Sequence, residues 1–154
     1  MNETTEKQAL SLLQQIIAIP SMSGDEELLS RFLENWLRER DFIVNKKNNN
    51  IWVESIIDES LPKILLNSHM DTIKVVAGWT LDPYLAEEDE DRIYGLGSSD
   101  AGGSLVSLMF AFVELAQLDN RNYNLVLLLS AEEENSGPNG ISTALEEIGK
   151  IDLA

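Results

Sequence analysis

Two continuous apolar runs constrain the fold of this chain most strongly. One, KILLN, covers residues 63–67 just after Pro62, and the other, NLVLLLSA, runs from Asn124 to Ala131. Both are too short to span a membrane and have no polar face, which is typical of strands buried on both sides. Such strands need helices to cover them. The sequence therefore predicts an α/β fold, a layered α/β/α sandwich with a mixed, largely parallel sheet.

The segments before, between and after these two strands contain apolar residues at helical spacing. Two of the predicted helices open on capping boxes, Thr5 with Gln8 and Ser23 with Glu26. The predicted helices run from Thr5 to before Pro20, from Ser23 to about Arg40, from Ser104 to Leu118, and onward from Gly140.

Shorter β-like segments complete the pattern. Phe42–Val44 and Ile51–Ile57 read as two strands joined at an exposed NKKNNN turn. The acidic run Glu87–Asp91 is typical of a solvated hairpin tip, because like charges need water around them. It is followed by RIYGLGSSDAGG, a short strand that leads into a glycine-rich loop.

Composition limits the partners. The chain has 154 residues, 44% of them hydrophobic, which is enough for one ordinary domain. Its formal net charge of −16 disfavours nucleic acid and anionic membranes as partners, and no uninterrupted apolar stretch approaches the ~18 residues of a membrane span. Without cysteine there is no disulfide or thiolate metal site, and without a signal-peptide pattern a cytoplasmic location is expected.

The only histidine, His69, stands where the first buried run ends, in the sequence HMD. In extended backbone, residues i and i+2 point the same way, so His69 and Asp71 share a face. A carboxylate beside an imidazole can fix its tautomer for metal binding. Taken alone, a single histidine after a strand is more often a surface or satisfied core residue than a metal ligand.

Two acidic groups are further candidates. Asp100, in GLGSSDAGG, stands before the predicted Ser104–Leu118 helix, where an Asp is also common as a cap. Glu132, Glu133 and Glu134 follow directly on the second buried strand, where a surface acid run is the alternative. Ligands of open α/β sheets gather beyond the carboxyl ends of the strands. One imidazole with several carboxylates and no thiolate suits a catalytic Zn²⁺ site.

With HMDTI, YGLGSSDAGG and AEEENSGPNG in this order, almost the whole chain resembles the dizinc aminoacylase and carboxypeptidase family, which includes acetylornithine deacetylase, succinyl-diaminopimelate desuccinylase and carboxypeptidase G. The resemblance implies a truncated zinc exopeptidase-like fold. By position, His69 resembles a zinc ligand, Asp71 the carboxylate that orients it, Asp100 the ligand that bridges two zinc ions, Glu133 the general base and Glu134 the ligand of the second zinc. A register shifted by one, with Glu132 as the base and Glu133 as the ligand, stays open.

The activity implied by the resemblance is hydrolysis of amide bonds in N-acyl amino acids, most like that of acetylornithine deacetylase. A zinc-bridging water would lose its proton to Glu133, and cobalt or manganese could replace zinc. A di- or tripeptidase of the same family is the alternative, and a non-catalytic module that binds a cation or a partner is another. The family often forms homodimers through a lid, so a homodimer of the complete enzyme is compatible with the resemblance.

The sequence departs from the family pattern in two places. Leu96 stands where Arg is common in the family, and DAGG replaces a run that often carries a basic residue. In addition, residues 1–154 resemble only the N-terminal part of the catalytic domain, without the lid or the C-terminal ligands. Because catalytic zinc normally has three protein ligands, we expect the 154-residue chain to be inactive alone.

Overall fold

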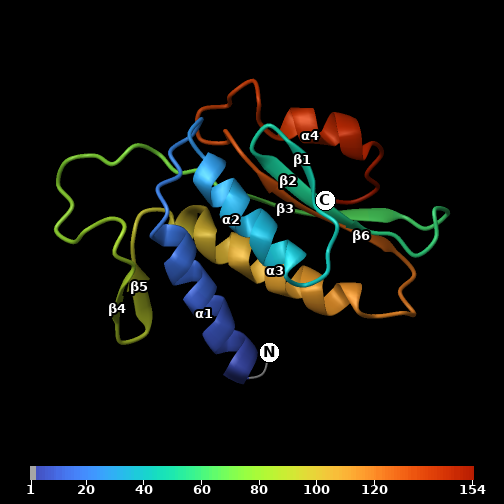
Figure 1. Ribbon diagram of the computed structural model, residues 1–154, viewed down its shortest axis with the longest axis horizontal. Coiled ribbons are helices and arrows are strands. Elements are labelled where there is room, and N and C mark those ends of the chain that lie inside the picture. The colour runs from blue at the N-terminus through green and yellow to red at the C-terminus, as the bar shows by residue number, and fades with distance from the viewer. Residues whose placement is uncertain (1–2) are drawn as a thin grey trace.

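The computed structural model describes residues 3–154 (Figure 1). The helices are α1 (Glu3–Ile17), α2 (Glu27–Arg38), α3 (Gly103–Ala116) and α4 (Ile141–Ile148), and a short helical turn, η1 (Ser98–Gly102), precedes α3. The strands are β1 (Asn45–Lys47), β2 (Asn50–Ser55), β3 (Lys63–His69), β4 (Glu87–Asp89), β5 (Arg92–Tyr94) and β6 (Asn124–Ser130).

Four of these strands form one mixed sheet in the order β1-β2-β6-β3. The two predicted apolar runs, β3 and β6, are parallel neighbours, with His69 opposite Ser130. The other two pairings, β1 with β2 and β2 with β6, are antiparallel. A mixed sheet is therefore confirmed, but the expectation that it is largely parallel is wrong for the described strands, because only β3 and β6 pair in parallel. Because β3 and β6 run parallel, the residues that follow them leave the sheet at the same edge.

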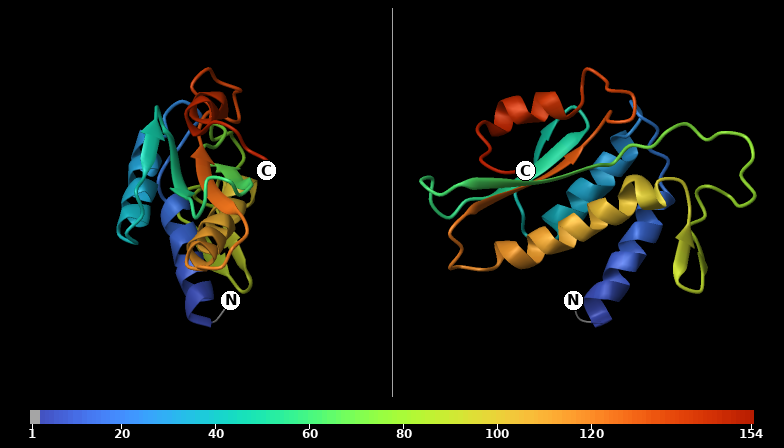
Figure 2. Two further views of the ribbon diagram at one scale, coloured as in Figure 1. Left: turned by 90° about the vertical axis from the view of Figure 1, so that its right-hand side faces the viewer. Right: turned by 180° about the vertical axis from the view of Figure 1, so that it is seen from behind.

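Helices cover both faces of this sheet. Figure 2 shows α4 on one side of it and α1 and α3 on the other, with α2 on the same side as α3. All seven residues of β6 are buried, because both faces of this strand are covered. Leu125, Leu127 and Leu129 pack toward α1, α2 and α3, whereas Val126 and Leu128 pack toward α4. The layered α/β/α architecture predicted from the two apolar runs is confirmed. The expectation that the KILLN run is buried on both sides is wrong, because β3 is an edge strand of the sheet and only Leu65 and Ser68 of it are buried.

The local predictions need three corrections. Phe42–Val44 is not a strand; β1 is Asn45–Lys47, because Phe42 and Val44 leave the end of α2 to pack on the core, where Phe42 contacts Phe112. Helix α1 already includes Glu3, so the Thr5 and Gln8 pair does not cap its start. Helix α2 begins at Glu27, and Ser23 lies in the preceding loop.

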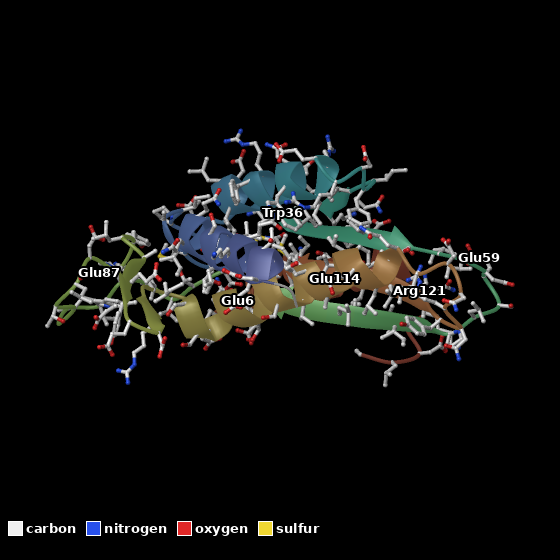
Figure 3. The ribbon with its side chains drawn as sticks, turned by 90° about the horizontal axis from the view of Figure 1, so that it is seen from below. Glu6, Trp36, Glu59, Glu87, Glu114 and Arg121 are labelled. Carbon is white, nitrogen blue, oxygen red and sulfur yellow. The ribbon has the colours of Figure 1, made fainter. Side chains whose placement is uncertain are left out.

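The acidic run forms the β4–β5 hairpin, as predicted, with every residue of β4 exposed. Figure 3 shows Glu87 on this hairpin at one end of the molecule, far from Glu59 at the other end. The Ser98–Ala116 segment is long and apolar enough to cross a membrane, by length and composition alone. A core helix passes the same test, and α3 packs against β3, β6 and α1 in the manner of one.

Candidate metal centre

The His69 imidazole is fixed in orientation by the residues just after β3. Its Nδ1 atom lies 3.0 Å from the Asp71 backbone oxygen and 3.5 Å from the Asp71 carboxylate. Met70, between them, is buried in the core below the sheet, so the alternation expected for an extended chain holds at this point. With Nδ1 occupied, Nε2 of His69 is directed toward the acidic groups of the neighbouring elements.

Asp100 reaches this nitrogen from a different part of the fold. Its Oδ1 atom lies 3.0 Å from His69 Nε2, and the Asp100 side chain is 80% exposed. The N-terminus of α3 has no side-chain cap, so the interpretation of Asp100 as a helix cap is wrong. The loop depends on Gly97, which has a φ of 77° and lies against Thr72, because a Cβ there would come within 2.6 Å of the Thr72 methyl group.

The acidic loop after β6 provides the other carboxylates. Glu133 Oε2 lies 3.9 Å from His69 Nε2. The Glu132 side chain turns away instead, and its carboxylate accepts hydrogen bonds from the backbone N–H and the side-chain amide of Asn139 at 3.0 and 2.9 Å. This placement favours the register in which Glu133 and Glu134 face the site.

Three of these side chains form a set suited to a metal ion. Ligand atoms of His69, Asp100 and Glu134 all lie within 4.8 Å of one another. They come from β3, from the turn before α3 and from the loop after β6, so only the folded chain assembles them. One imidazole with carboxylates and no thiolate fits Zn²⁺ or a similar divalent ion. The structure thus brings together the three ligands predicted from the sequence, although their roles stay predictions.

The charges at the site are strongly coupled. The hydrogen bond with the Asp71 carboxylate outweighs the cost of burial and raises the pKa of His69 to about 9. Burial opposes ionisation of Asp71, but hydrogen bonds from His69, from two backbone N–H groups and from Ser23 lower the pKa of Asp71 to about 2. Burial and the nearby Asp100 carboxylate raise the pKa of Glu134. A cation bound between His69, Asp100 and Glu134 would relieve the repulsion among the carboxylates.

We expect the imidazole of the metal-free chain to titrate near pH 9. The folded-state pKa of His69 lies above the ordinary 6.5, so the proton stabilises the fold below pH 6.5 and this contribution is lost as the pH rises through about 9. Because the chain has one histidine, its imidazole NMR signals can be assigned without mutation. A titration in chelator gives the midpoint directly, and a midpoint near 6.5 would contradict the prediction. Zinc must displace this proton, so its affinity should rise with pH up to the same midpoint.

Sequence reasoning missed Ser23, which lies far from the site in sequence. Its hydroxyl donates to Asp71 Oδ2 at 2.7 Å, so it supports the carboxylate that supports His69. The chain around Ser23 runs beside the segment after β3, where the Ser23 N–H donates to the Thr72 oxygen at 3.0 Å. The local sequence favoured a helix cap at Ser23 and contains no signal for a contact 48 residues away.

A family model described as peptidase family M20/M25/M40 matches residues 65–153, the span that contains His69, Asp100 and the acidic loop. The chain belongs to this peptidase family. Relatives in sequence include a succinyl-diaminopimelate desuccinylase of Helicobacter hepaticus, 27% identical over 94% of this chain and 41% of that protein. An acetylornithine deacetylase of Proteus mirabilis is 29% identical over 82% of this chain and 36% of its own length.

Solved structures of the M20 family share the fold. A metallo-carboxypeptidase of Sulfolobus solfataricus superposes with a TM-score of 0.76 at 24% identity, over 96% of this chain and 34% of that one. A dinuclear metal-binding peptidase of Bacillus subtilis gives a TM-score of 0.70 at 14% identity, over 95% and 40% of the two chains. The 154 residues thus span about two fifths of the length of an M20 relative such as the desuccinylase.

Proposed function

We propose that this chain carries one part of a two-metal hydrolytic centre, and that the enzyme to which it corresponds cleaves amide bonds of N-acyl amino acids. The observation that carries the proposal is the convergence of ligand atoms of His69, Asp100 and Glu134 within 4.8 Å, with the Glu133 carboxylate 3.9 Å from His69 Nε2. Membership of the M20 family supports metal-dependent hydrolysis as the reaction class. Zinc is the metal we favour, with cobalt or manganese as alternatives on the same ligands.

Bound zinc would supply Lewis acidity, which polarises a carbonyl oxygen and makes water more acidic. The residues of this chain would divide the remaining work. His69 and Glu134 would each hold one metal position and Asp100 would serve both, while Asp71 keeps the imidazole oriented. On this assignment Glu133 is not a metal ligand, so its carboxylate would be available to take a proton from the attacking water and pass it to the leaving nitrogen.

For the substrate, we propose an N-acyl amino acid of the kind that acetylornithine deacetylase hydrolyses. The sequence relatives named acetylornithine deacetylase and succinyl-diaminopimelate desuccinylase support this class. Di- or tripeptides are the second candidate, favoured by structural relatives such as a dipeptidase of Saccharomyces cerevisiae and a tripeptidase of Staphylococcus aureus. A cytoplasmic location, which the absence of cysteine led us to expect, is part of the same proposal.

Separate Gln substitutions of the three consecutive glutamates test these roles. We expect Glu133→Gln to keep the metal and, in an enzyme of the relatives' length that contains this chain, to lower kcat by about 10²–10⁴-fold, the range for a lost general acid–base group. Glu134→Gln should weaken metal binding, and Glu132→Gln should preserve the metal ligands. The measurements are zinc affinity and release of free amine from N-acetyl amino acids and dipeptides.

The shifted register predicts the opposite pattern. In that case Glu133→Gln would weaken zinc binding and Glu132→Gln would abolish hydrolysis with the metal retained. A non-catalytic cation-binding module predicts no hydrolysis by any form, including the unsubstituted enzyme of full length.

A further inference from the structure

Where the acidic loop leaves β6, four consecutive backbone N–H groups each donate a hydrogen bond to a side-chain oxygen from another part of the chain. The amides of Ala131–Glu134 donate, in chain order, to Asn50 Oδ1, to Glu26 Oε1 and to the two carboxylate oxygens of Asp71, over 3.0, 3.2, 3.1 and 3.0 Å. Three buried polar side chains therefore set the path of the segment that carries Glu133 and Glu134.

Among these anchors, Glu26 has no part in the chemistry described above. Its side chain is completely buried, and each of its carboxylate oxygens is used. Besides the Glu132 amide, Oε1 accepts the Gly24 N–H at 2.6 Å, and Oε2 accepts the Asn49 side-chain amide at 2.9 Å. Within residues 3–154, no lysine or arginine forms an ion pair with it. Burying a carboxylate without a cationic partner is costly, and the N–H donors around Glu26 offset only part of that cost.

We propose that Glu26 is a positioning residue for the metal centre, acting through the backbone of Glu132 on the two acids that follow it. This inference rests on the proposed function. Glu132 has a left-handed backbone, with φ of 54°, and the chain turns there from the end of β6 toward His69. Fixing the Glu132 N–H fixes the start of that turn. The direction in which Glu133 and Glu134 leave the sheet is then set by Glu26 together with Asp71.

Glu26 acts in this role as a hydrogen-bond acceptor rather than as a charge. Its three partners are all N–H donors, and a glutamine can serve them if its oxygen takes the Oε1 position and its amide faces Asn49, whose own amide can turn over. Aspartate keeps the charge but is one methylene shorter. We expect the shorter carboxylate to keep its hydrogen bond with the Gly24 N–H, two residues away in the same loop, but to lose the one with the Glu132 N–H.

The test compares Glu26→Ala, Glu26→Asp and Glu26→Gln with the parent 154-residue chain. Zinc affinity is measured by chelator competition. We expect it to fall about 10–100-fold in the Ala variant, which is the range for losing a residue that supports metal ligands without binding the metal. It should fall in the Asp variant as well. The Gln variant should stay within about threefold of the parent, since its acceptor is retained. Leu37→Ala, at a fully buried position on α2, provides a destabilised control that we expect to keep the parent's zinc affinity.

Amide hydrogen exchange in the metal-free chain gives a second readout that does not depend on zinc. We expect residues 132–134 to exchange faster in Glu26→Ala and Glu26→Asp, relative to β6 amides of the same sample, and not in Glu26→Gln or Leu37→Ala. If Glu26→Ala does not fold, the Asp and Gln pair decides the question. If the parent binds no zinc, the expectation that these 154 residues hold zinc by themselves fails, whereas the exchange data still test Glu26.

Three outcomes would overturn the inference. One is a loss of zinc affinity in Leu37→Ala as large as in the Glu26 variants, which would reduce Glu26 to a contributor to overall stability. Another is that Glu26→Asp keeps the zinc affinity of the parent while Glu26→Gln loses it, which would show that the charge of Glu26 is the property that matters. The third is unchanged exchange at residues 132–134 in Glu26→Ala or, if that variant does not fold, in Glu26→Asp.

Discussion

His69→Ala is expected to lose the zinc that the parent chain retains after equilibration and desalting. Its imidazole is the one nitrogen ligand in the set, and its removal leaves the carboxylates of Asp100 and Glu134. Removing a residue that only supports a metal ligand lowers metal affinity about 10–100-fold. Removing the ligand itself should therefore lower zinc affinity by more than about 100-fold. Elemental analysis of zinc per chain, for both proteins prepared side by side, is the measurement.

Nonspecific binding must be separated from this result, because the chain has a net charge of −16. Glu90→Gln, in the exposed β4–β5 turn, removes one acidic charge that is not part of the His69, Asp100 and Glu134 set and should leave zinc per chain unchanged. Equal zinc in the parent and in His69→Ala would place the metal on surface carboxylates and contradict the prediction. No zinc in either would mean that the ligands within these 154 residues do not hold the ion by themselves, as a non-catalytic half-site would behave.

The parts of the fold that the sequence predicts well are those with strong local signals. The run from Asn124 to Ser130 is apolar enough to require cover on both faces, and the structure buries every residue of it. The acidic hairpin follows from simple repulsion between like charges. Local signals also mislead, as at Phe42 and Val44, which look like a strand but pack on the core as the chain leaves α2.

The candidate site was predictable to the extent that its ligands follow buried strands. His69 and the acidic loop lie at the same sheet edge because β3 and β6 are parallel neighbours. The supports of the site were not predictable in this way. Ser23 and Glu26 were both assigned to a capping box, but they contact Asp71 and the Glu132 amide, 48 and 106 residues distant. No local pattern encodes contacts over such separations.

Asp71 should be the side chain of the site whose loss most destabilises the metal-free fold. It is 1% exposed, and its carboxylate accepts the Ser23 hydroxyl and the N–H groups of Glu133 and Glu134. Asp71→Asn places an amide against these donors and removes the charge beside His69. Because unpaired buried polar groups cost about 1–3 kcal/mol each, we expect the free energy of unfolding to fall by about 3 kcal/mol in urea denaturation at pH 7.

The pH dependence identifies the cause of this destabilisation. With a pKa lowered from the ordinary 3.8 to about 2, ionised Asp71 contributes about 2 kcal/mol above pH 3.8, and this contribution is lost as the pH falls through 2. The difference between the parent and Asp71→Asn should therefore shrink over the same interval, whereas an effect of packing alone would persist. Asp58→Asn is the matched control, because Asp58 is exposed and its carboxylate accepts the N–H and the hydroxyl of the neighbouring Ser60, so its loss should cost less than about 1 kcal/mol. Equal effects of the two substitutions at pH 7 would show that the Asp71 hydrogen bonds do not hold the acidic loop.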